Sequence, residues 1–268
     1  MSLQKLEFRR GTDVRHAVFA VVDDTELLPY SAAPELMLSA AELAQYANLH
    51  FAQKRQAFML GRLAAKTALG AMLEESAWPN ISIRAGVFGQ PLVTHPRALG
   101  IDVTVSHSND VAVAVAFPAD WPMGIDLETV AGDAVAAVVA ALDASAEERA
   151  WLAAEPMGGS ANCGVLWTAR EALGKALKTG LNSPLGILSL CNFKPAIADP
   201  ADPADPAGAA GAASAAGSYT NFPQFRWLAQ AFGERVLTLA LPREIELVTP
   251  PRLPLPGLPL LSLLLPMR

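Results

Sequence analysis

The sequence has little of what secreted, membrane-spanning or nucleic-acid-binding proteins carry. It holds two cysteines in 268 residues, Cys163 and Cys191, and their spacing matches no metal-binding pattern. So few cysteines, behind an N-terminus without an apolar core, predict a reducing, cytoplasmic compartment. No run of about eighteen apolar residues appears, so no membrane-spanning helix is expected. The net charge of −6 predicts no general attraction to nucleic acid or to acidic membranes.

Familiar phosphate-binding strings are missing as well. The chain has no glycine-rich P-loop (G-x-x-x-x-G-K-[ST]) and none of the common kinase strings, which argues against an ordinary nucleotide hydrolase or kinase. Apolar residues, in contrast, make up 52% of the chain. That share is ample for a packed core, in one large domain or in two of moderate size.

A pair of acids in a short apolar stretch is the first candidate site. The stretch Gly124-Ile125-Asp126-Leu127-Glu128 alternates as a strand does, so Asp126 and Glu128 share one face while the residues between them face a core. Neighbouring carboxylates repel one another unless a cation lies between them, and Mg²⁺ takes oxygen ligands. The pattern indicates a metal site, although two solvated acids at a strand end would show the same spacing.

A helix with good helix formers is predicted over residues 167–178, with Gly180 at its C-terminal stop. Glu171 and Lys175 are four residues apart and therefore lie on one face, with Lys178 one turn beyond. A surface ion pair would explain this spacing too. In the functional interpretation, Glu171 is a third carboxylate for the metal and Lys175 contacts a phosphoryl oxygen.

A histidine between two serines, Ser106-His107-Ser108, ends the first strand of a predicted β-hairpin. The hairpin strands are expected at Val103–His107 and Val111–Phe117, with turn residues between them. A histidine can donate to a phosphate, although a lone histidine in a half-apolar strand is more often structural. Its two flanking hydroxyl groups and its position about twenty residues before the acidic pair favour a phosphate contact.

Together, these segments resemble the signature of the surfactin-synthetase-activating type of 4′-phosphopantetheinyl transferase. S-H-S, G-I-D-L-E and W-T-A-R-E-A-L-G-K-A occur in the order and spacing of that family, and the resemblance spans roughly residues 54–181. It implies an α+β fold of two similar halves related by a pseudo-twofold axis, with the active site in the cleft between them.

The resemblance and the composition together divide the chain. The N-terminal half, with a basic helix and the S-H-S strand, is expected at residues 1–121, and the C-terminal half, with the acidic site, at 122–248. Residues 196–217 hold almost only Ala, Gly, Asp, Pro and Ser, so a flexible insertion is predicted there. Residues 249–268 form a tail rich in Pro and Leu, whose prolines exclude a regular helix through most of its length.

The reaction that the resemblance implies is transfer of 4′-phosphopantetheine from coenzyme A to a serine of an apo acyl carrier protein or peptidyl carrier domain, with release of 3′,5′-ADP. The implied metal is Mg²⁺, with Mn²⁺ as a substitute, on Asp126, Glu128 and Glu171. The implied catalytic residues are Glu171, Lys175 and His107. The expected partners are coenzyme A and the carrier, and the chain is expected to be a monomer.

Coenzyme A is expected to be held by cations and by a turn. The residues assigned to it are Arg55, Arg62, Gln90, Pro91, Ser106, His107 and Lys175. Arg55 and Arg62 share one side of a helix predicted over residues 54–69, with Lys66 as a further candidate. A guanidinium can bind phosphate through two hydrogen bonds, although a solvated basic face would give the same pattern.

The sequence departs from the family pattern at two positions. Arg170 stands where a lysine usually precedes the helix glutamate, and Gln90 stands where the turn usually carries Lys or Arg. The neutral glutamine leaves affinity for the donor in question, not the chemistry. Family members also carry a glutamate near the site that Glu147 or Glu148 could supply, and the S-x-x-E spacing favours Glu148. A helix-capping acid would explain that spacing equally well.

Two other functions stay open at this point. A catalytically inactive relative would bind a carrier or a nucleotide without transfer, but it should lack one of the three acids, and all three are present. Another Mg-dependent phosphoryl-transfer enzyme is the remaining alternative.

Overall fold

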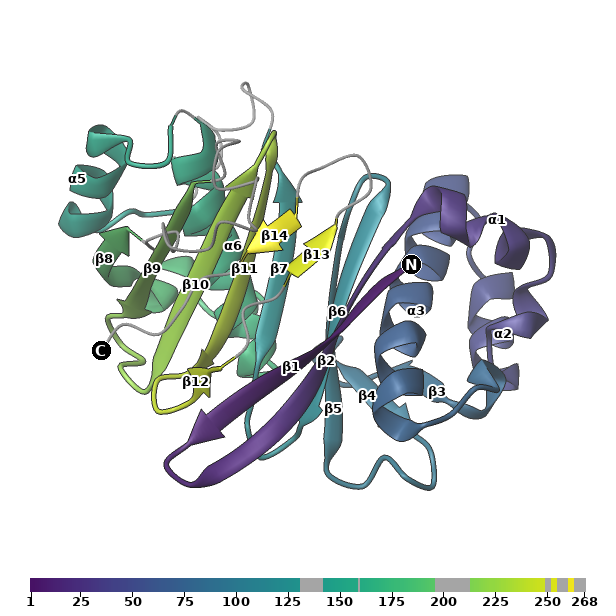
Figure 1. The fold of residues 1–268 in the computed structure, drawn as a ribbon. Helices are drawn as coiled ribbons and strands as arrows, with labels where there is room; N and C mark the ends of the chain where they lie inside the picture. Colours follow the sequence, from purple (N-terminus) through teal and green to yellow (C-terminus); the bar gives the residue numbers. More distant parts are fainter. Residues whose placement is uncertain (131–141, 159, 196–212, 249–251, 255–259, 263–268) are drawn as a thin grey trace.

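The computed structural model describes residues 1–130, 142–158, 160–195, 213–248, 252–254 and 260–262. Within these residues the chain is a mixed α/β fold built on two five-stranded antiparallel sheets (Figure 1). Most of the insertion predicted over residues 196–217 lies outside the described residues, as does much of the tail. No helix of the described part is long and apolar enough to cross a membrane.

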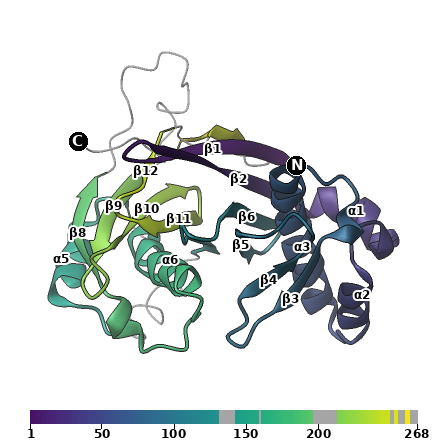
Figure 2. The ribbon, with the colours of Figure 1, turned by 90° about the horizontal axis from the view of Figure 1, so that it is seen from below.

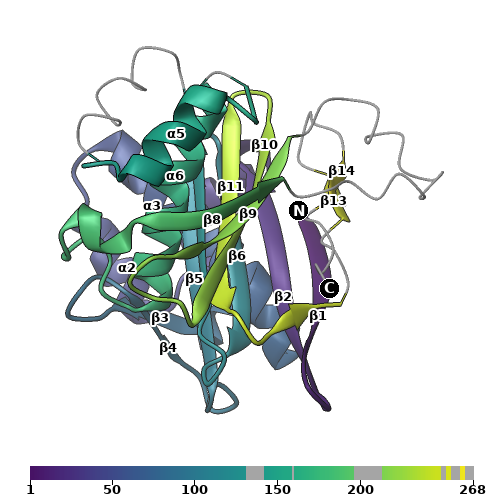
Figure 3. The same ribbon diagram turned by 90° about the vertical axis from the view of Figure 1, so that its left-hand side faces the viewer.

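The first sheet has the strand order β12-β1-β2-β6-β5. Its strands are β1 (Ser2–Arg10), β2 (Asp13–Asp23), β5 (Ile101–Ser108), β6 (Val111–Pro118) and β12 (Glu246–Leu247). The hairpin predicted around the S-H-S motif is confirmed as β5 and β6. The last strand, β12, comes from the C-terminal part of the chain and pairs with β1, so this sheet takes strands from both ends of the described chain (Figure 3).

Helices cover the outer face of the first sheet. They are α1 (Asp24–Ala32), α2 (Ala40–Ala47) and α3 (Ala52–Leu73), and a two-stranded ribbon of β3 (Ser82–Ala85) and β4 (Pro91–Thr94) lies beside them. Helix α3 packs on β2, β5 and β6, because its inward face is a run of leucines and alanines. Short 3₁₀ turns lie at η1 (Pro34–Leu36), η2 (Trp78–Asn80) and, in the second half, η3 (Leu185–Leu188).

The second sheet has the strand order β7-β11-β10-β9-β8. Its strands are β7 (Gly124–Thr129), β8 (Leu190–Pro195), β9 (Ser214–Tyr219), β10 (Phe225–Phe232) and β11 (Arg235–Pro242). The predicted insertion is wrong at its C-terminal end, since residues 214–217 belong to β9 and pair with β10. Glycine is needed at position 217, because a side chain there would meet the ring of Trp227.

Among the described residues, the second sheet is accompanied by α5 (Ala146–Ala154) and α6 (Ser160–Ala176), and α6 packs on β7 and β11. Helix α6 starts well before the predicted residue 167 and ends two residues before 178. In the tail, β13 (Arg252–Pro254) pairs with β14 (Leu260–Ser262). Seen from below, α3 and α6 lie on opposite sides of the molecule, with β1 and β2 spanning it (Figure 2).

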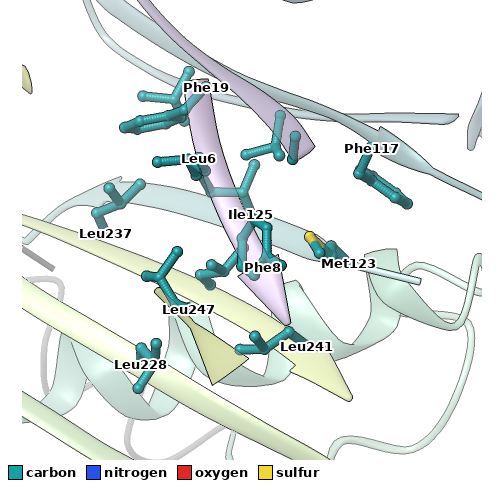
Figure 4. Packing of buried hydrophobic residues seen from close by; sticks show 14 of the residues in the cluster. Leu6, Phe8, Phe19, Phe117, Met123, Ile125, Leu228, Leu237, Leu241 and Leu247 are labelled. Atoms are coloured by element: carbon teal, nitrogen blue, oxygen red, sulfur yellow. The ribbon is translucent and has the colours of Figure 1, made fainter. Parts of the chain in front are cut away.

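Three apolar clusters hold these layers together. One lies between the two sheets and joins β1, β2 and β6 to β7, β10 and β11, with Phe8, Phe19, Ile125 and Leu237 among its members (Figure 4). The second lies under α3 and the third under α6. The alternation predicted for β7 is confirmed, since Ile125 and Leu127 are 1% exposed and enter the cluster between the sheets.

Helix α6 approaches β7 so closely that a glycine is required between them. A Cβ added to Gly124 would clash with the carbonyl oxygen of Ala172 and would lie 2.7 Å from the amide nitrogen of Ala176. The glycine that opens G-I-D-L-E therefore sets the distance between the strand that carries the acids and the helix that carries Glu171 and Lys175.

We predict that Gly124→Ala lowers the free energy of unfolding by about 1–3 kcal/mol, because the added methyl overpacks the contact between helix and strand. Gly61→Ala is the matched control. Its Cβ would lie 3.7 Å from Val105 Cγ1, an ordinary contact, and alanine favours the helix by up to about 1 kcal/mol. Urea unfolding of both variants tests whether the free energy of unfolding falls in Gly124→Ala and does not fall in Gly61→Ala. A loss of stability in both variants would contradict the account of Gly124.

Candidate functional site

The two sheets meet edge to edge at β5 and β7, where side-chain hydroxyls take the place of a backbone ladder. Alternate residues of β5 point toward β7. Thr104 Oγ1 accepts from the amide of Ile125 at 3.1 Å, and Ser108 Oγ accepts from the amide of Thr129 at 2.9 Å. These bonds satisfy amide groups that the edge of a sheet would otherwise leave without a partner. The hydroxyls thus fix β5 beside the strand that carries the acids.

Asp126 lies at the centre of this contact and is 5% exposed. Its Oδ1 accepts from Ser106 Oγ at 2.7 Å and from Lys175 Nζ at 2.6 Å, and Lys175 also donates to the carbonyl oxygen of Ile125 at 3.1 Å. The other oxygen, Oδ2, is buried and has no hydrogen-bond partner among the described residues. A buried carboxylate oxygen without a donor is a position that a cation would satisfy.

Glu128 lies on the same face of β7, as the strand pattern predicted. Its Oε1 accepts from Ser108 Oγ at 3.1 Å and from the amide of Thr129 at 3.1 Å. Ser108 thereby links the end of the S-H-S motif to the second acid, just as Ser106 links the motif to Asp126. Both serines are therefore partners of the acidic pair.

Glu171 reaches toward the acidic pair from α6. Burial, the largest cause, and the negative charge of Asp126 raise the pKa of Glu171, Lys175 lowers it and Glu128 adds a smaller increase, and together they bring it to about 7. These contributions show that the three carboxylates lie near enough to interact through their charges. The electrostatic field at this place therefore disfavours a further negative charge unless a cation is added.

Two adjoining cavities open on either side of Glu171 and Lys175. The larger, of about 320 Å³, is lined by Val105, Ser106, His107, Asp126, Glu128, Trp167, Glu171 and Lys175. The smaller, of about 200 Å³, has these lining residues: Phe88, Gly89, Gln90, Pro91, Asp102, Val103, Thr104, Val105, Phe117, Met123, Glu171, Lys175, Lys178 and Gly180. Both combine residues of β5 with residues of α6. Eight of the ten predicted site residues line these cavities, and His107 is exposed in the larger one.

The chemistry of the donors fits a hard divalent ion. Asp126, Glu128 and Glu171 supply only oxygen atoms, and one oxygen of Asp126 is free to bind. As the side chains stand, no three His, Cys, Asp or Glu groups in the described ranges are gathered closely enough to hold an ion. Binding would therefore need the glutamates to turn toward Asp126, which Lys175 meanwhile neutralises.

The two arginines predicted to bind phosphate lie elsewhere. The Arg62 guanidinium pairs with the buried carboxylate of Glu42 at 2.9 Å, and Lys66 Nζ bonds the same carboxylate at 2.6 Å. Arg55 is exposed near the start of α3, where its Nε donates to the carbonyl oxygen of Leu49 at 2.6 Å. None of the three lines either cavity, so their positions give no support to a phosphate role.

Glu147 and Glu148 differ in burial and in their hydrogen-bond partners. Glu148 caps α5 as the S-x-x-E spacing predicted, and its fully buried carboxylate accepts from both the amide of Leu190 at 2.8 Å and Arg170 Nη2 at 2.7 Å. Glu147 is exposed and accepts from the amide of Asn192 at 2.6 Å. Neither glutamate lines the cavities, and Arg170 is a buried partner of Glu148 instead of a site cation.

Sequence reasoning missed Thr104, Asp102 and the apolar cavity wall. The signal for Thr104 was present, since T-V-S-H-S places hydroxyl groups at alternate positions of a strand and hence on one side. No comparable signal marks Phe117 or Met123, because an apolar residue at the end of a strand looks the same whether it lines a core or a cavity.

We predict that Thr104→Val lowers the free energy of unfolding by about 1–3 kcal/mol, because the buried amide of Ile125 loses its acceptor. Thr104→Ser keeps the hydroxyl and removes only a methyl, so it should cost less. Chemical denaturation measures both. Equal losses would mean that packing of the methyl, and not the hydrogen bond, supports the junction.

Comparison with known proteins adds one family match. A family model described as the 4′-phosphopantetheinyl transferase superfamily matches residues 122–201, which is less than a third of the chain. That stretch contains Asp126, Glu128, Glu171 and Lys175. Among curated proteins no match is found.

Several solved structures match part of the chain at low identity. A holo-(acyl-carrier-protein) synthase from Bacillus anthracis, solved in complex with CoA (3′,5′-ADP), is 17% identical with a TM-score of 0.33. A holo-ACP synthase from Plasmodium yoelii is 15% identical with a TM-score of 0.33, and an acyl carrier protein synthase from the same organism with ADP bound is 15% identical with a TM-score of 0.34. Each match covers 44% of this chain and 97% of the other. Overlaps this low do not establish a shared fold.

Proposed function

We propose that the chain transfers 4′-phosphopantetheine from coenzyme A to a serine of an apo carrier protein and releases 3′,5′-ADP. One observation carries the proposal: Asp126, Glu128, Glu171 and Lys175 line one cavity, and all four lie in the stretch that matches the transferase model. That cavity lies between β5 of one sheet and α6 of the other half and adjoins a second cavity, so a donor and an acceptor would approach Glu171 and Lys175 from the two cavities.

The finer assignment is to the surfactin-synthetase-activating type, with two halves related by a pseudo-twofold axis. The support for it is the S-H-S motif on β5 and the recurrence of one plan, a five-stranded sheet with a long helix on its outer face, α3 in one half and α6 in the other. The proposed halves are residues 1–121 and 122–248, with β12 of the second joined to the sheet of the first.

In the proposed reaction, the carrier serine Oγ forms a bond to the β-phosphorus of coenzyme A. The bond between that phosphorus and the bridging oxygen breaks, and the oxygen leaves on 3′,5′-ADP. Glu171 accepts the proton of the serine, because its carboxylate lies where the two cavities adjoin. Lys175 neutralises charge on the phosphoryl oxygens, and the exposed His107 donates to a phosphate of the donor.

Mg²⁺, or Mn²⁺ in its place, would be held by Asp126, Glu128 and Glu171, with the free Oδ2 of Asp126 as one ligand. The ion would supply neutralisation of the pyrophosphate charge. Coenzyme A would contact Gln90, Pro91 and Ser106 along the cavity walls. Arg55 and Arg62 are left out of the donor site because of their positions. The acceptor would be an acyl or peptidyl carrier, and the expected setting stays the cytoplasm, with the chain as a monomer.

The test is intact-mass spectrometry of several apo carrier proteins incubated with the purified chain, coenzyme A and Mg²⁺. We expect one phosphopantetheine added to the carrier serine, and no addition when a chelator removes the metal. Detectable coenzyme A binding without transfer to any carrier would favour a catalytically inactive binding relative. Metal-dependent hydrolysis of nucleotides without transfer would favour another phosphoryl-transfer enzyme.

We predict that Glu171→Gln lowers the transfer rate at least about 100-fold, because a positioned base contributes that much or more. Its thermal stability should not fall, since burial disfavours the charged form of this carboxylate. Glu147→Gln is the matched control, as Glu147 is exposed and outside both cavities, and its transfer rate should equal that of the parent chain. Unchanged transfer by Glu171→Gln would remove Glu171 from the chemistry.

A further inference from the structure

Lys178 occupies a backbone conformation that suits glycine. It follows the last turn of α6 with a φ of 60°, and its amide donates to the carbonyl oxygen of Lys175 at 3.0 Å. The next amide, of Thr179, donates to the carbonyl oxygen of Gly174 at 2.9 Å, and this bond caps the C-terminal end of the helix. Left-handed closing positions of this kind favour glycine, because a Cβ is strained there. A lysine at this position therefore raises the question of what its side chain contributes.

The side chain of Lys178 points into the cavity between the two halves. It lines the cavity of about 200 Å³ together with Glu171, Lys175 and Gln90. Its Nζ bonds Asp102 Oδ2 of β5, so the pair spans from the end of α6 to the edge of the first sheet. The Lys178 side chain is 46% exposed and that of Asp102 is 14% exposed. Because the lysine side chain is nearly half exposed, solvent screens this ion pair and its net stabilisation is small.

The cavities contain few cations for a donor that carries several phosphate charges. Among the described residues that line them, Lys175 and Lys178 are the two with a permanent positive charge, and Lys175 already pairs with Asp126. Gln90, at the turn where a cation is usual in the resembled family, is neutral and bonds the amide of Phe88 through Oε1. Arg62 forms an ion pair with Glu42 outside the cavity. Lys178 is thus the cation that remains for an anion entering the smaller cavity.

We propose that Lys178 binds a phosphate group of the donor and exchanges Asp102 for it when the donor enters. This inference rests on the proposed function, because the donor it names is coenzyme A. A phosphate monoester carries more negative charge than one carboxylate and offers three acceptor oxygens, so it competes well for an exposed ammonium group. Asp102 holds the amine across the cavity while no donor is bound, and it weakens donor binding by competing for that amine.

The proposal predicts opposite effects for the two partners of the ion pair. Lys178→Met removes the charge and keeps a long side chain, and it should raise the dissociation constant for coenzyme A about tenfold or more, the usual loss for a charged hydrogen bond. Lys178→Gly should raise it similarly while the melting temperature stays equal or rises, because glycine relieves the backbone strain. Asp102→Asn should lower the dissociation constant, since the competing carboxylate is gone.

Isothermal titration of the full chain with coenzyme A and Mg²⁺ measures these constants, and the carrier assay measures KM in parallel. Glu74→Gly is the matched control for strain. Glu74 has a φ of 52° at the end of α3 and is exposed outside both cavities, so this variant should raise the melting temperature without changing coenzyme A binding.

Two results would overturn the inference. Unchanged coenzyme A affinity in Lys178→Met would mean that the amine touches no phosphate. An equal loss of coenzyme A affinity in Lys178→Met and Asp102→Asn would mean that the ion pair has only a structural role and links the two halves. Failure of the parent chain to bind coenzyme A or to modify any carrier would instead refute the proposed function, and the two failures are therefore distinguishable.

Discussion

The row of hydroxyl groups along β5 is the interaction on which the arrangement of the site depends. An ordinary ladder between β5 and β7 would merge the two sheets into one, with little room beside the acids. Thr104, Ser106 and Ser108 instead satisfy the edge of β7 through side chains and bond both acids of that strand. The sheets therefore stay separate layers on a shared apolar cluster, and cavities open beside the acids where the two edges meet. The same three side chains therefore position β7 and supply hydrogen bonds to its two acids.

The orientation of α6 depends on a second buried constraint. Arg170 and Glu148 are both fully buried, with two bonds of 2.7 and 2.8 Å between Arg170 Nη2 and the carboxylate. An ion pair buried so deeply gains little net stability, and its attraction offsets the cost of desolvation only when the geometry is good. Since Glu171 follows Arg170 directly, holding the arginine on the covered side of α6 turns the glutamate toward the cleft. Gly124 then sets how closely that helix approaches the acids.

Strand alternation carried most of what could be predicted of the site. It placed Asp126 and Glu128 on one face, and helix spacing placed Glu171 and Lys175 together, because both patterns depend only on local geometry. The failures concern partners far apart in sequence. Nothing around Arg62 shows that Glu42 of α2 pairs with it. Likewise, nothing in the composition of residues 196–217 shows that position 217 lies in β9, where Trp227 of the next strand leaves no room for a side chain. Contacts of this kind form between elements that are distant in sequence, so local sequence patterns do not predict them.

The charge of the cleft depends on which basic residues are paired with buried glutamates elsewhere in the fold. Two of the cations predicted to suit phosphate, Arg62 and Lys66, bind Glu42 in the core of the first half. Arg170, which stands where the family pattern has a lysine, binds Glu148 in the second half. A buried carboxylate needs such a partner, and once paired the cation has no charge to offer a ligand. The cleft is consequently rich in acids and poor in cations. Under the proposed function, a metal ion that offsets the acids would favour binding of the anionic donor, so affinity for the donor and affinity for the metal should depend on one another.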